Sequence, residues 1–197
     1  MLRKNKAAQT FPSRIVCLSY DAVEILHSIG CAEKIVGQPA GANKPGMERV
    51  KSIGGFGSPD IGAIEALKPD IVIGYSEICA DVIADLTRKN ITTLALQHTS
   101  LEEIYISITL LGRVTGNTTE AGALIETMQR QFQEIAAYIP KNSRRAVVYF
   151  EEWNKPYVCG TQWVSEVINI AGGIDSFGKH CRAKKYLERE VTTNDVT

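Results

Sequence analysis

Residues 14–30 read RIVCLSYDAVEILHSIG, and this stretch decides the expected fold. Its first six residues form a short apolar run rich in β-branched side chains, which is typical of a buried strand. Residues 21–29 then place apolar side chains three and four positions apart, as on one face of a helix, and Gly30 supplies a C-terminal stop. The stretch therefore predicts a strand followed by a helix, the repeating unit of α/β proteins.

The same alternation continues through the first half of the chain. Short apolar runs at residues 34–38, 70–76 and 92–97 predict three further strands. Helical spacing at residues 61–67 and 80–89 places helices between them. Because strands and helices alternate, we expect a parallel sheet covered by helices on both faces.

The second half begins with two helices and then returns to strands. Ser100 is expected to cap the first helix, with Glu103 three residues later completing a capping box. The longest helix is expected over residues 118–138, where apolar side chains form one stripe. Residues 145–152 (RAVVYFEE) predict a new strand, and residues 163–171 predict a helix. The long helix follows four strands, so it predicts a spacer between two lobes.

The overall composition excludes several classes of protein. The chain has 197 residues with 22 basic and 22 acidic side chains, so its formal net charge is zero, and 44% of its residues are apolar. A balanced charge gives no reason to expect nucleic acid as a partner, because nucleic acid favours a basic surface. No apolar run reaches the length of about 18 residues that a membrane-spanning helix needs. We therefore expect a globular protein that does not bind nucleic acid.

The cysteines and histidines predict neither a disulfide framework nor a metal site. The five cysteines are an odd number, and no two form a Cys-x-x-Cys motif. Most are expected to serve as small apolar packing residues. The three histidines fall in separate segments, without the spacing of a zinc site. The residues concerned are Cys17, Cys31, Cys79, Cys159, Cys181, His27, His98 and His180.

Polar and aromatic residues gather where the expected strands end. Ligands of open parallel sheets bind beyond the carboxyl ends of the strands, so these residues are the candidate binding set. A structural alternative stays open for each kind, because aromatic side chains also pack in cores and paired carboxylates also form solvated strand ends. The predicted ligand-binding residues are Tyr20, Phe56, Ser76, Glu77, Gln97, Glu151, Glu152, Trp153 and Trp163.

Two of these predictions have a specific physical reason. Phe56 lies in the glycine-dense sequence SIGGFGSP, whose small neighbours leave its ring exposed. Glu151 and Glu152 directly follow a β-branched run and are hard to bury unpaired, so at least one is expected to face solvent or a cleft. The chain has no nucleophile elbow, Walker loop or complete dinucleotide fingerprint. An enzyme that uses Glu151 or Glu152 as a general acid or base is an alternative, but we predict that the protein is not an enzyme.

Several motifs in a fixed order mark a resemblance to a known family. These are RIVCLSYDAVEILHSIG at residues 14–30, IEALKPDIVIG at residues 64–74 and FEEWNKPYVCGTQWVSEVINIAGG at residues 150–173. With them, the chain resembles the substrate-binding proteins of ABC importers for vitamin B12, ferric siderophores and haem. Residues 150–173 look most like the cobalamin-binding branch. The resemblance implies an α/β fold of two Rossmann-like lobes with parallel sheets, joined by one long connecting helix.

This resemblance also suggests where the parts of the chain begin and end. We expect an N-terminal α/β lobe over residues 14–115, a connecting helix over residues 118–139 and a C-terminal α/β lobe over residues 144–197. The family continues into another strand and helix beyond the position of residues 191–197. We therefore expect the second lobe to be incomplete in this sequence, with an unpaired sheet edge.

Function follows from the resemblance as an expectation. The family binds its ligand in a cleft between the lobes and passes it to a membrane permease. The implied ligand is a cobalamin-like tetrapyrrole or a ferric siderophore, carried as cargo with no cofactor, and the implied partner is an ABC permease. Phe56 matches the position at which cobalamin binders place an aromatic ring against the corrin. The family docks its permease through an acidic residue on each lobe, for which Asp60, Glu65 and Asp195 are the candidates.

Location and oligomeric state are the last expectations. The resemblance implies an extracytoplasmic protein, and we expect a monomer. Residues 1–10 (MLRKNKAAQT) lack the apolar segment of a secretory signal peptide. A cytoplasmic tetrapyrrole carrier or sensor on the same scaffold is therefore the alternative.

Overall fold

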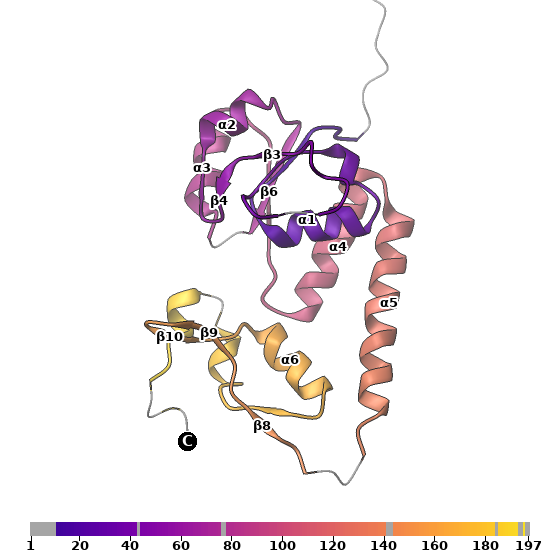
Figure 1. Cartoon of the computed structure of the whole chain (residues 1–197), viewed down its shortest axis with the longest axis vertical. Coiled ribbons are helices and arrows are strands. Elements are labelled where there is room, and N and C mark those ends of the chain that lie inside the picture. The colour runs from indigo at the N-terminus through magenta and orange to yellow at the C-terminus, as the bar shows by residue number, and fades with distance from the viewer. Residues whose placement is uncertain are drawn as a thin grey trace, which may run out of the picture. The chain divides into compact units, whose positions relative to one another are not determined.

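The computed structural model describes residues 11–42, 44–75, 78–140, 144–183, 185–192 and 195. Strands and helices alternate along the first half of the chain and two long helices follow, which confirms the predicted α/β fold (Figure 1). The chain divides into two compact units. Unit 1 comprises Met1–Leu96 and Ile108–Leu124, and unit 2 comprises Gln97–Ser107 and Ile125–Thr197.

The division between the units runs through two helices. These are α4 (Leu101–Thr115) and α5 (Thr118–Ala137). The sequence predicts a single connecting helix, whereas here both helices have residues in each unit. Residues 97–107, expected in the first lobe, belong to unit 2.

Unit 1 is built on one five-stranded sheet in the order β3-β2-β1-β6-β7, and every neighbouring pair is parallel. The central strand β1 places Ile15 opposite Ile35 of β2 and Ile71 of β6. The sequence predicts four of the five strands but not β3, because its two polar residues carry no periodic pattern. The strands are β1 (Ile15–Cys17), β2 (Ile35–Gln38), β3 (Lys51–Ser52), β6 (Ile71–Tyr75) and β7 (Thr93–Leu96).

Helices cover both faces of this sheet. Figure 1 shows α2 and α3 on one side and α1 on the other. Val16 and Val72 of the sheet belong to a buried apolar cluster with Ile64 of α2 and Leu86 of α3. In such a doubly wound sheet the strand order reverses beside the first strand, so the switch point lies between β1 and β6. The helices are α1 (Tyr20–Ser28), α2 (Ile61–Ala66) and α3 (Ala80–Arg88).

The turn before β6 is fixed by polar contacts that account for the sequence Lys68-Pro69-Asp70. Oδ2 of Asp70 accepts hydrogen bonds from the backbone N–H groups of Ser13 (2.8 Å) and Arg14 (2.9 Å). Nε of Arg14 donates in return to the carbonyl oxygens of Leu67 (3.0 Å) and Lys68 (3.2 Å). The hydrogen bond from Ser13 is the main reason why the pKa of Asp70 lies below its usual value. These contacts connect the starts of β1 and β6.

The described residues of unit 2 contain two small sheets. Strands β9 and β10 form an antiparallel pair, and β8 and β11 form a parallel pair. Residues 145–152 are therefore not the single strand that the sequence predicts, because β8 and β9 belong to different sheets. A continuous apolar run does not reveal where a chain changes its pairing partner. The strands are β8 (Val147–Val148), β9 (Glu151–Asn154), β10 (Tyr157–Cys159) and β11 (Ile174–Asp175).

A small buried cluster lies between these strands and the last described turns. It consists of Cys159, Phe177, Cys181 and Val191. Cys159 ends β10, and Cys181 lies in the 3-10 helix η2 (His180–Arg182). Helix α6 (Gln162–Ile170) lies between the two cysteines in the sequence, and a second 3-10 helix, η3 (Tyr186–Arg189), follows η2.

The start of α4 partly follows the predicted capping box. The N–H of Glu103 donates to Oγ of Ser100 (3.2 Å), as predicted. The Glu103 carboxylate accepts from the N–H of Thr99 (2.9 Å) rather than from that of Ser100. Among the described residues, no helix combines the length and the apolar character needed to cross a membrane.

Candidate ligand-binding site

The carboxyl edge of the unit 1 sheet carries an aromatic pair. Tyr20 begins α1 just after β1, and Phe56 lies in the turn between β4 (Gly54–Gly55) and β5 (Ser58–Pro59). The centroids of the two rings are 5.6 Å apart, and the ring planes meet at 36°. Tyr20 is 45% exposed and Phe56 is 40% exposed. The pair presents an apolar wall at the edge where ligands of this fold class bind.

Hydrogen bonds hold this pair in place. The Tyr20 hydroxyl donates to the carbonyl oxygen of Ala40 (2.8 Å), and the N–H of Ala40 donates to the carbonyl oxygen of Gly54 (2.8 Å). The chain after β2 therefore connects the tyrosine to the hairpin that carries Phe56. Gly54 and Gly57 have φ angles of +99° and +85°, which glycine adopts without strain. The glycine-dense sequence thus forms a tight hairpin with Phe56 at its tip.

Ile78 extends the apolar wall beyond the predicted residues. A Cβ atom at Gly57 would lie 3.6 Å from Cγ2 of Ile78, so this side chain borders the hairpin turn. Ile78 is also exposed, which is unusual for isoleucine. We call Tyr20, Phe56 and Ile78 the edge cluster. It lies close to the switch point because Tyr20 follows β1 and Ile78 follows β6.

Two polar side chains lie near the same edge. Oγ of Ser19 and Oε1 of Gln38 are buried, and neither has a hydrogen-bond partner within the described part of the chain. Ser19 follows β1 and Gln38 ends β2. Gln38 and Ile78 were not among the residues predicted from the sequence, and the structure adds them as candidates. The position of Gln38 at the end of a predicted strand was a usable signal, whereas Ile78 has no such signal.

Unit 2 exposes its two tryptophans. Trp153 lies in β9 and is 58% exposed, and its Nε1–H donates to the carbonyl oxygen of Lys155 (3.1 Å). Trp163 lies at the start of α6 and is 38% exposed, and its backbone N–H donates to the carbonyl oxygen of Thr99 (2.9 Å). Neither side chain is buried in a core, so core packing does not account for them. Both remain candidates for contact with an apolar ligand.

The two adjacent glutamates have separate partners. The Tyr149 hydroxyl donates to Glu151, and this hydrogen bond raises the pKa of Tyr149 to about 12. Glu152 forms an ion pair with Arg189, whose side chain is only 4% exposed. Both glutamates are exposed residues, which agrees with the expectation that at least one faces solvent. Their partners indicate structural roles for both carboxylates.

Three predicted ligand-binding residues remain, namely Gln97, Ser76 and Glu77, and the structure describes only the first of them. Gln97 is exposed, and its carbonyl oxygen accepts a hydrogen bond from Oγ of Ser107 (3.0 Å). It directly follows Leu96, the last residue of β7, and the division of the chain assigns it to unit 2. Ser76 and Glu77 lie outside the described residues.

The three candidate docking acids each have a partner within the chain. Asp60 caps α2 by accepting a hydrogen bond from a backbone N–H of its first turn (3.0 Å). Glu65 forms an ion pair with Lys89 (3.0 Å). Asp195 accepts hydrogen bonds from the N–H and hydroxyl of Thr192 (2.7 Å each). Glu65 is the acid whose partner is a flexible, exposed side chain.

A pocket of about 500 Å³ lies in unit 2 and differs in character from the edge cluster. Its lining includes Glu166, Asp175, Lys179, His180 and Arg182. None of the predicted ligand-binding residues lines it. Within the described residues, no three histidine, cysteine, aspartate or glutamate side chains form a group that could hold a metal ion.

A comparison with protein families identifies the chain. Residues 15–189 match the model of the family described as periplasmic binding protein. The chain therefore belongs to the periplasmic binding protein family, whose members are solute-binding proteins and not enzymes. This confirms the resemblance drawn from the sequence motifs, and it removes the alternative in which Glu151 or Glu152 serves catalysis.

Curated relatives are identical to the chain at about a quarter of the aligned positions. An uncharacterized ABC transporter substrate-binding lipoprotein of Bacillus subtilis is 28% identical in an alignment of 170 positions that covers 81% of this chain and 54% of that protein. A cobalamin-binding protein of Halobacterium salinarum is 26% identical in an alignment of 169 positions that covers 82% of this chain and 45% of that protein. The chain thus spans about half the length of the curated relatives it matches.

Solved structures share the fold. The periplasmic vitamin B12 binding protein of Vibrio cholerae superposes with a TM-score of 0.72 at 22% identity, covering 94% of this chain and 72% of that one. A Staphylococcus aureus protein complexed with heme superposes with a TM-score of 0.73 at 23% identity, covering 92% of this chain and 69% of that one. At these identities the likeness concerns the fold alone.

Proposed function

We propose that the chain captures a cobalamin-like tetrapyrrole for delivery to an ABC importer. The edge cluster carries this proposal, because it presents two adjacent aromatic rings at the carboxyl edge of a doubly wound sheet. Among the relatives, one at 26% identity is named a cobalamin-binding protein, which favours a corrin over the other ligands of the family. A ferric siderophore is the second candidate ligand.

The chemistry of a corrin suits these residues. A corrin or porphyrin is a broad, largely apolar plate with polar groups at its rim, so it binds best to aromatic walls beside a few hydrogen-bonding groups. Tyr20 and Phe56 supply such a wall, and the buried Ser19 and Gln38 supply polar atoms close to the same edge. The polar pocket of unit 2 offers charged side chains instead, which suit an apolar plate poorly.

The tryptophans of unit 2 are a second candidate wall. Trp153 and Trp163 are exposed and lie in the segment whose sequence looks most like the cobalamin-binding branch. That the ligand is held between the two units, as the resemblance implies, stays a prediction. A Trp153→Ala change tests this prediction, because it alters the affinity for the ligand only if unit 2 contributes to the same binding site as the edge cluster.

A titration of the full chain tests the proposal. Purified protein is titrated with cyanocobalamin, haem and a ferric siderophore, and the heat of binding is measured. We expect saturable binding to cyanocobalamin, weakened in Phe56→Ala by about 1–3 kcal/mol, which is roughly 5- to 150-fold in Kd. Tyr138→Ala serves as the matched control, because Tyr138 is an aromatic residue that is 87% exposed, lies beyond the end of α5 and belongs to unit 2 rather than to the unit that carries the edge cluster.

The outcomes separate the candidates. Saturable binding to the siderophore alone would replace the tetrapyrrole by the second ligand. No saturable binding to any of the three compounds would refute a solute-binding role for the chain. Equal affinities in Phe56→Ala and Tyr138→Ala would refute the edge cluster as the binding surface.

Delivery to a permease and an extracytoplasmic location belong to the same proposal. The family is described as periplasmic, and one relative is a lipoprotein, which supports both. Deleting the gene in its host should lower uptake of the labelled ligand that binds in the titration. Normal uptake in the deletion strain would contradict delivery.

A further inference from the structure

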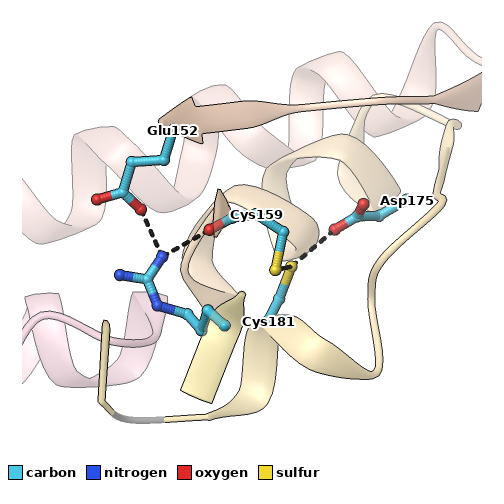
Figure 2. A network of polar contacts seen from close by, with 5 residues as sticks. Glu152, Cys159, Asp175 and Cys181 are labelled. Atoms are coloured by element: carbon cyan, nitrogen blue, oxygen red, sulfur yellow. Dashed lines mark hydrogen bonds and ion pairs between the residues drawn. The ribbon is translucent and has the colours of Figure 1, made fainter. Parts of the chain in front are cut away.

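Two buried thiols of unit 2 lie in contact. Sγ of Cys159, at the end of β10, and Sγ of Cys181, in η2, are 3.7 Å apart (Figure 2). Each cysteine is 1% exposed. A disulfide bond has a sulfur–sulfur length of about 2 Å, so the two sulfurs need to approach by less than about 2 Å to form one. The residues are 22 positions apart in the sequence, which is why their spacing predicted no pairing.

The groups around the thiols make them chemically different. Cys181 hydrogen-bonds to the Cys159 sulfur and lies 3.2 Å from Oδ2 of Asp175. The contact with Cys159, burial and the Asp175 carboxylate all raise the pKa of Cys181. The hydrogen bond from Cys181 lowers the pKa of Cys159, and the positive charge of Arg189 acts in the same direction. Cys159 is therefore the thiol that ionises first and attacks a disulfide.

The two cysteines also belong to the buried core of unit 2. Cys159 and Cys181 are two of the four residues of the buried cluster in unit 2, with Phe177 and Val191. A core of this size contributes little apolar burial, and small domains commonly compensate with disulfides. The chain segment between the two cysteines contains α6 and β11. A bond between them would join η2 to the hairpin that carries Trp153, and it would close a loop that contains α6, the helix that carries Trp163.

We propose that Cys159 and Cys181 are the site of a reversible disulfide that stabilises unit 2 when the chain meets an oxidising compartment. The oxidant is a disulfide donor, R–S–S–R. The Cys159 thiolate attacks one donor sulfur and releases R–S⁻, which takes up a proton. Cys181 then loses its proton and attacks Cys159 in the mixed disulfide, releasing the second R–S⁻. The chain loses two protons and two electrons in total, and the donor takes them up to become two R–SH.

Access to the thiols sets the rate of this exchange. Because both sulfurs are buried, the donor reaches Cys159 only when η2 opens locally. The N–H of Cys181 donates to the carbonyl oxygen of Phe177 (3.1 Å), and this hydrogen bond breaks on opening. We therefore expect slow oxidation in native conditions and slow reduction afterwards. The inference is independent of the ligand proposed above.

Oxidation of the purified full chain tests the inference. The protein is incubated with oxidised glutathione or with a reducing dithiol, its free thiols are alkylated after denaturation, and its peptides are identified by mass spectrometry. We expect a Cys159–Cys181 disulfide in the oxidised sample, with Cys17, Cys31 and Cys79 alkylated. The oxidised form should have a Tm about 5–10 °C higher than the reduced form.

Two variants test whether the Cys159–Cys181 disulfide itself causes the rise in Tm. Cys181→Ser should abolish both the disulfide and the rise in Tm on oxidation, whereas the matched control Cys31→Ser in unit 1 should retain both. The comparison of oxidised with reduced wild-type protein needs no variant, so poor folding of Cys181→Ser leaves the test intact. A linkage that involves unit 1 cysteines, no linkage after prolonged oxidation, or an unchanged Tm would overturn the inference.

Discussion

The two units of this chain are stabilised in different ways. Unit 1 has a five-stranded parallel sheet whose central strands are buried under helices, with an apolar cluster that includes Val16, Leu18 and Leu86. The described part of unit 2 has two two-stranded sheets and a buried cluster of four residues, two of them cysteines. Apolar burial responds little to pH or redox state, whereas ion pairs and thiols respond directly.

This difference bears on function. The edge cluster is attached to the unit with the larger core, through hydrogen bonds of Tyr20 and Gly54 with Ala40. If the edge cluster binds the ligand as proposed, such a frame would hold the aromatic wall in position beforehand and so lower the entropic cost of binding. The exposed tryptophans of unit 2 lie on elements held by polar contacts and by the Cys159–Cys181 pair. We therefore expect the ligand-binding surface of unit 1 to stay the same when pH or redox state changes, and that of unit 2 to vary.

The largest effect is expected from a cavity in the unit 1 core. Leu18 is buried among Val16, Val72 and Cys79, so Leu18→Ala should lower the free energy of unfolding by about 2–5 kcal/mol. Leu187→Ala makes the same chemical change at a side chain that is 73% exposed, and it should change stability by less than about 0.5 kcal/mol. Urea unfolding of both variants measures the difference. If Leu18→Ala and Leu187→Ala were equally stable, apolar burial could not be what stabilises unit 1.

A smaller effect is expected from the polar network of unit 2. Nη1 of Arg189 donates to the carbonyl oxygen of Cys159 (2.7 Å) and pairs with Glu152. Arg189→Met keeps much of the side-chain volume but leaves both acceptors without this donor, so it should cost about 2 kcal/mol. Glu152→Gln retains a polar group at an exposed position and should cost about 1 kcal/mol or less. An Arg189→Met protein as stable as wild type would show that packing alone holds unit 2.

Much of unit 1, but less of unit 2, could be predicted from the sequence. Strands β1, β2 and β6 have apolar, β-branched runs because they are mostly buried, and the edge strand β7 keeps a shorter apolar run; such patterns can be recognised without a structure. The exposure of Phe56 could be predicted for a similar local reason, since glycines on both sides determine a tight turn. Local sequence patterns were therefore enough to predict these elements of unit 1, where a strand followed by a helix is the repeating unit.

Unit 2 depends on contacts between distant residues, which local patterns do not encode. The run at residues 145–152 looks like one strand, although its two ends pair with different segments. Glu152 gains its partner from Arg189, and Cys159 gains its neighbour from Cys181. Neither pairing follows from spacing, because each depends on how the turns after α6 fold back.

An acid titration would sharpen the comparison further. The pKa of Asp70 is lowered by hydrogen bonds from Ser13 and Arg14, so its contribution to stability is present above the unfolded-state pKa of about 4 and is lost as the pH falls below it. Asp70→Asn should cost about 1 kcal/mol at pH 7, and the gap from wild type should close as the pH falls toward 3. Urea unfolding at several pH values measures the gap. A gap that does not depend on pH would contradict the charge-assisted contact.

The smallest effect is expected at the surface of unit 1. The Glu65–Lys89 ion pair is exposed, so Glu65→Gln should change the free energy of unfolding by less than about 0.5 kcal/mol. This makes the variant a clean probe of permease docking, because a loss of ligand delivery could not arise from unfolding. A thermal scan checks the first part. A large fall in Tm would show that this pair supports unit 1 more than its exposure indicates.

Hydrogen–deuterium exchange of the reduced, ligand-free full chain tests the central claim most directly, namely that unit 1 is the rigid frame and unit 2 the conditional one. Exchange rates report the free energy of local opening segment by segment. The account predicts that amides of β1, β2 and β6 exchange at least about tenfold more slowly than those of β8 to β11, a difference of about 1.4 kcal/mol or more in opening free energy. Equal protection in both units, or slower exchange in unit 2, would contradict it.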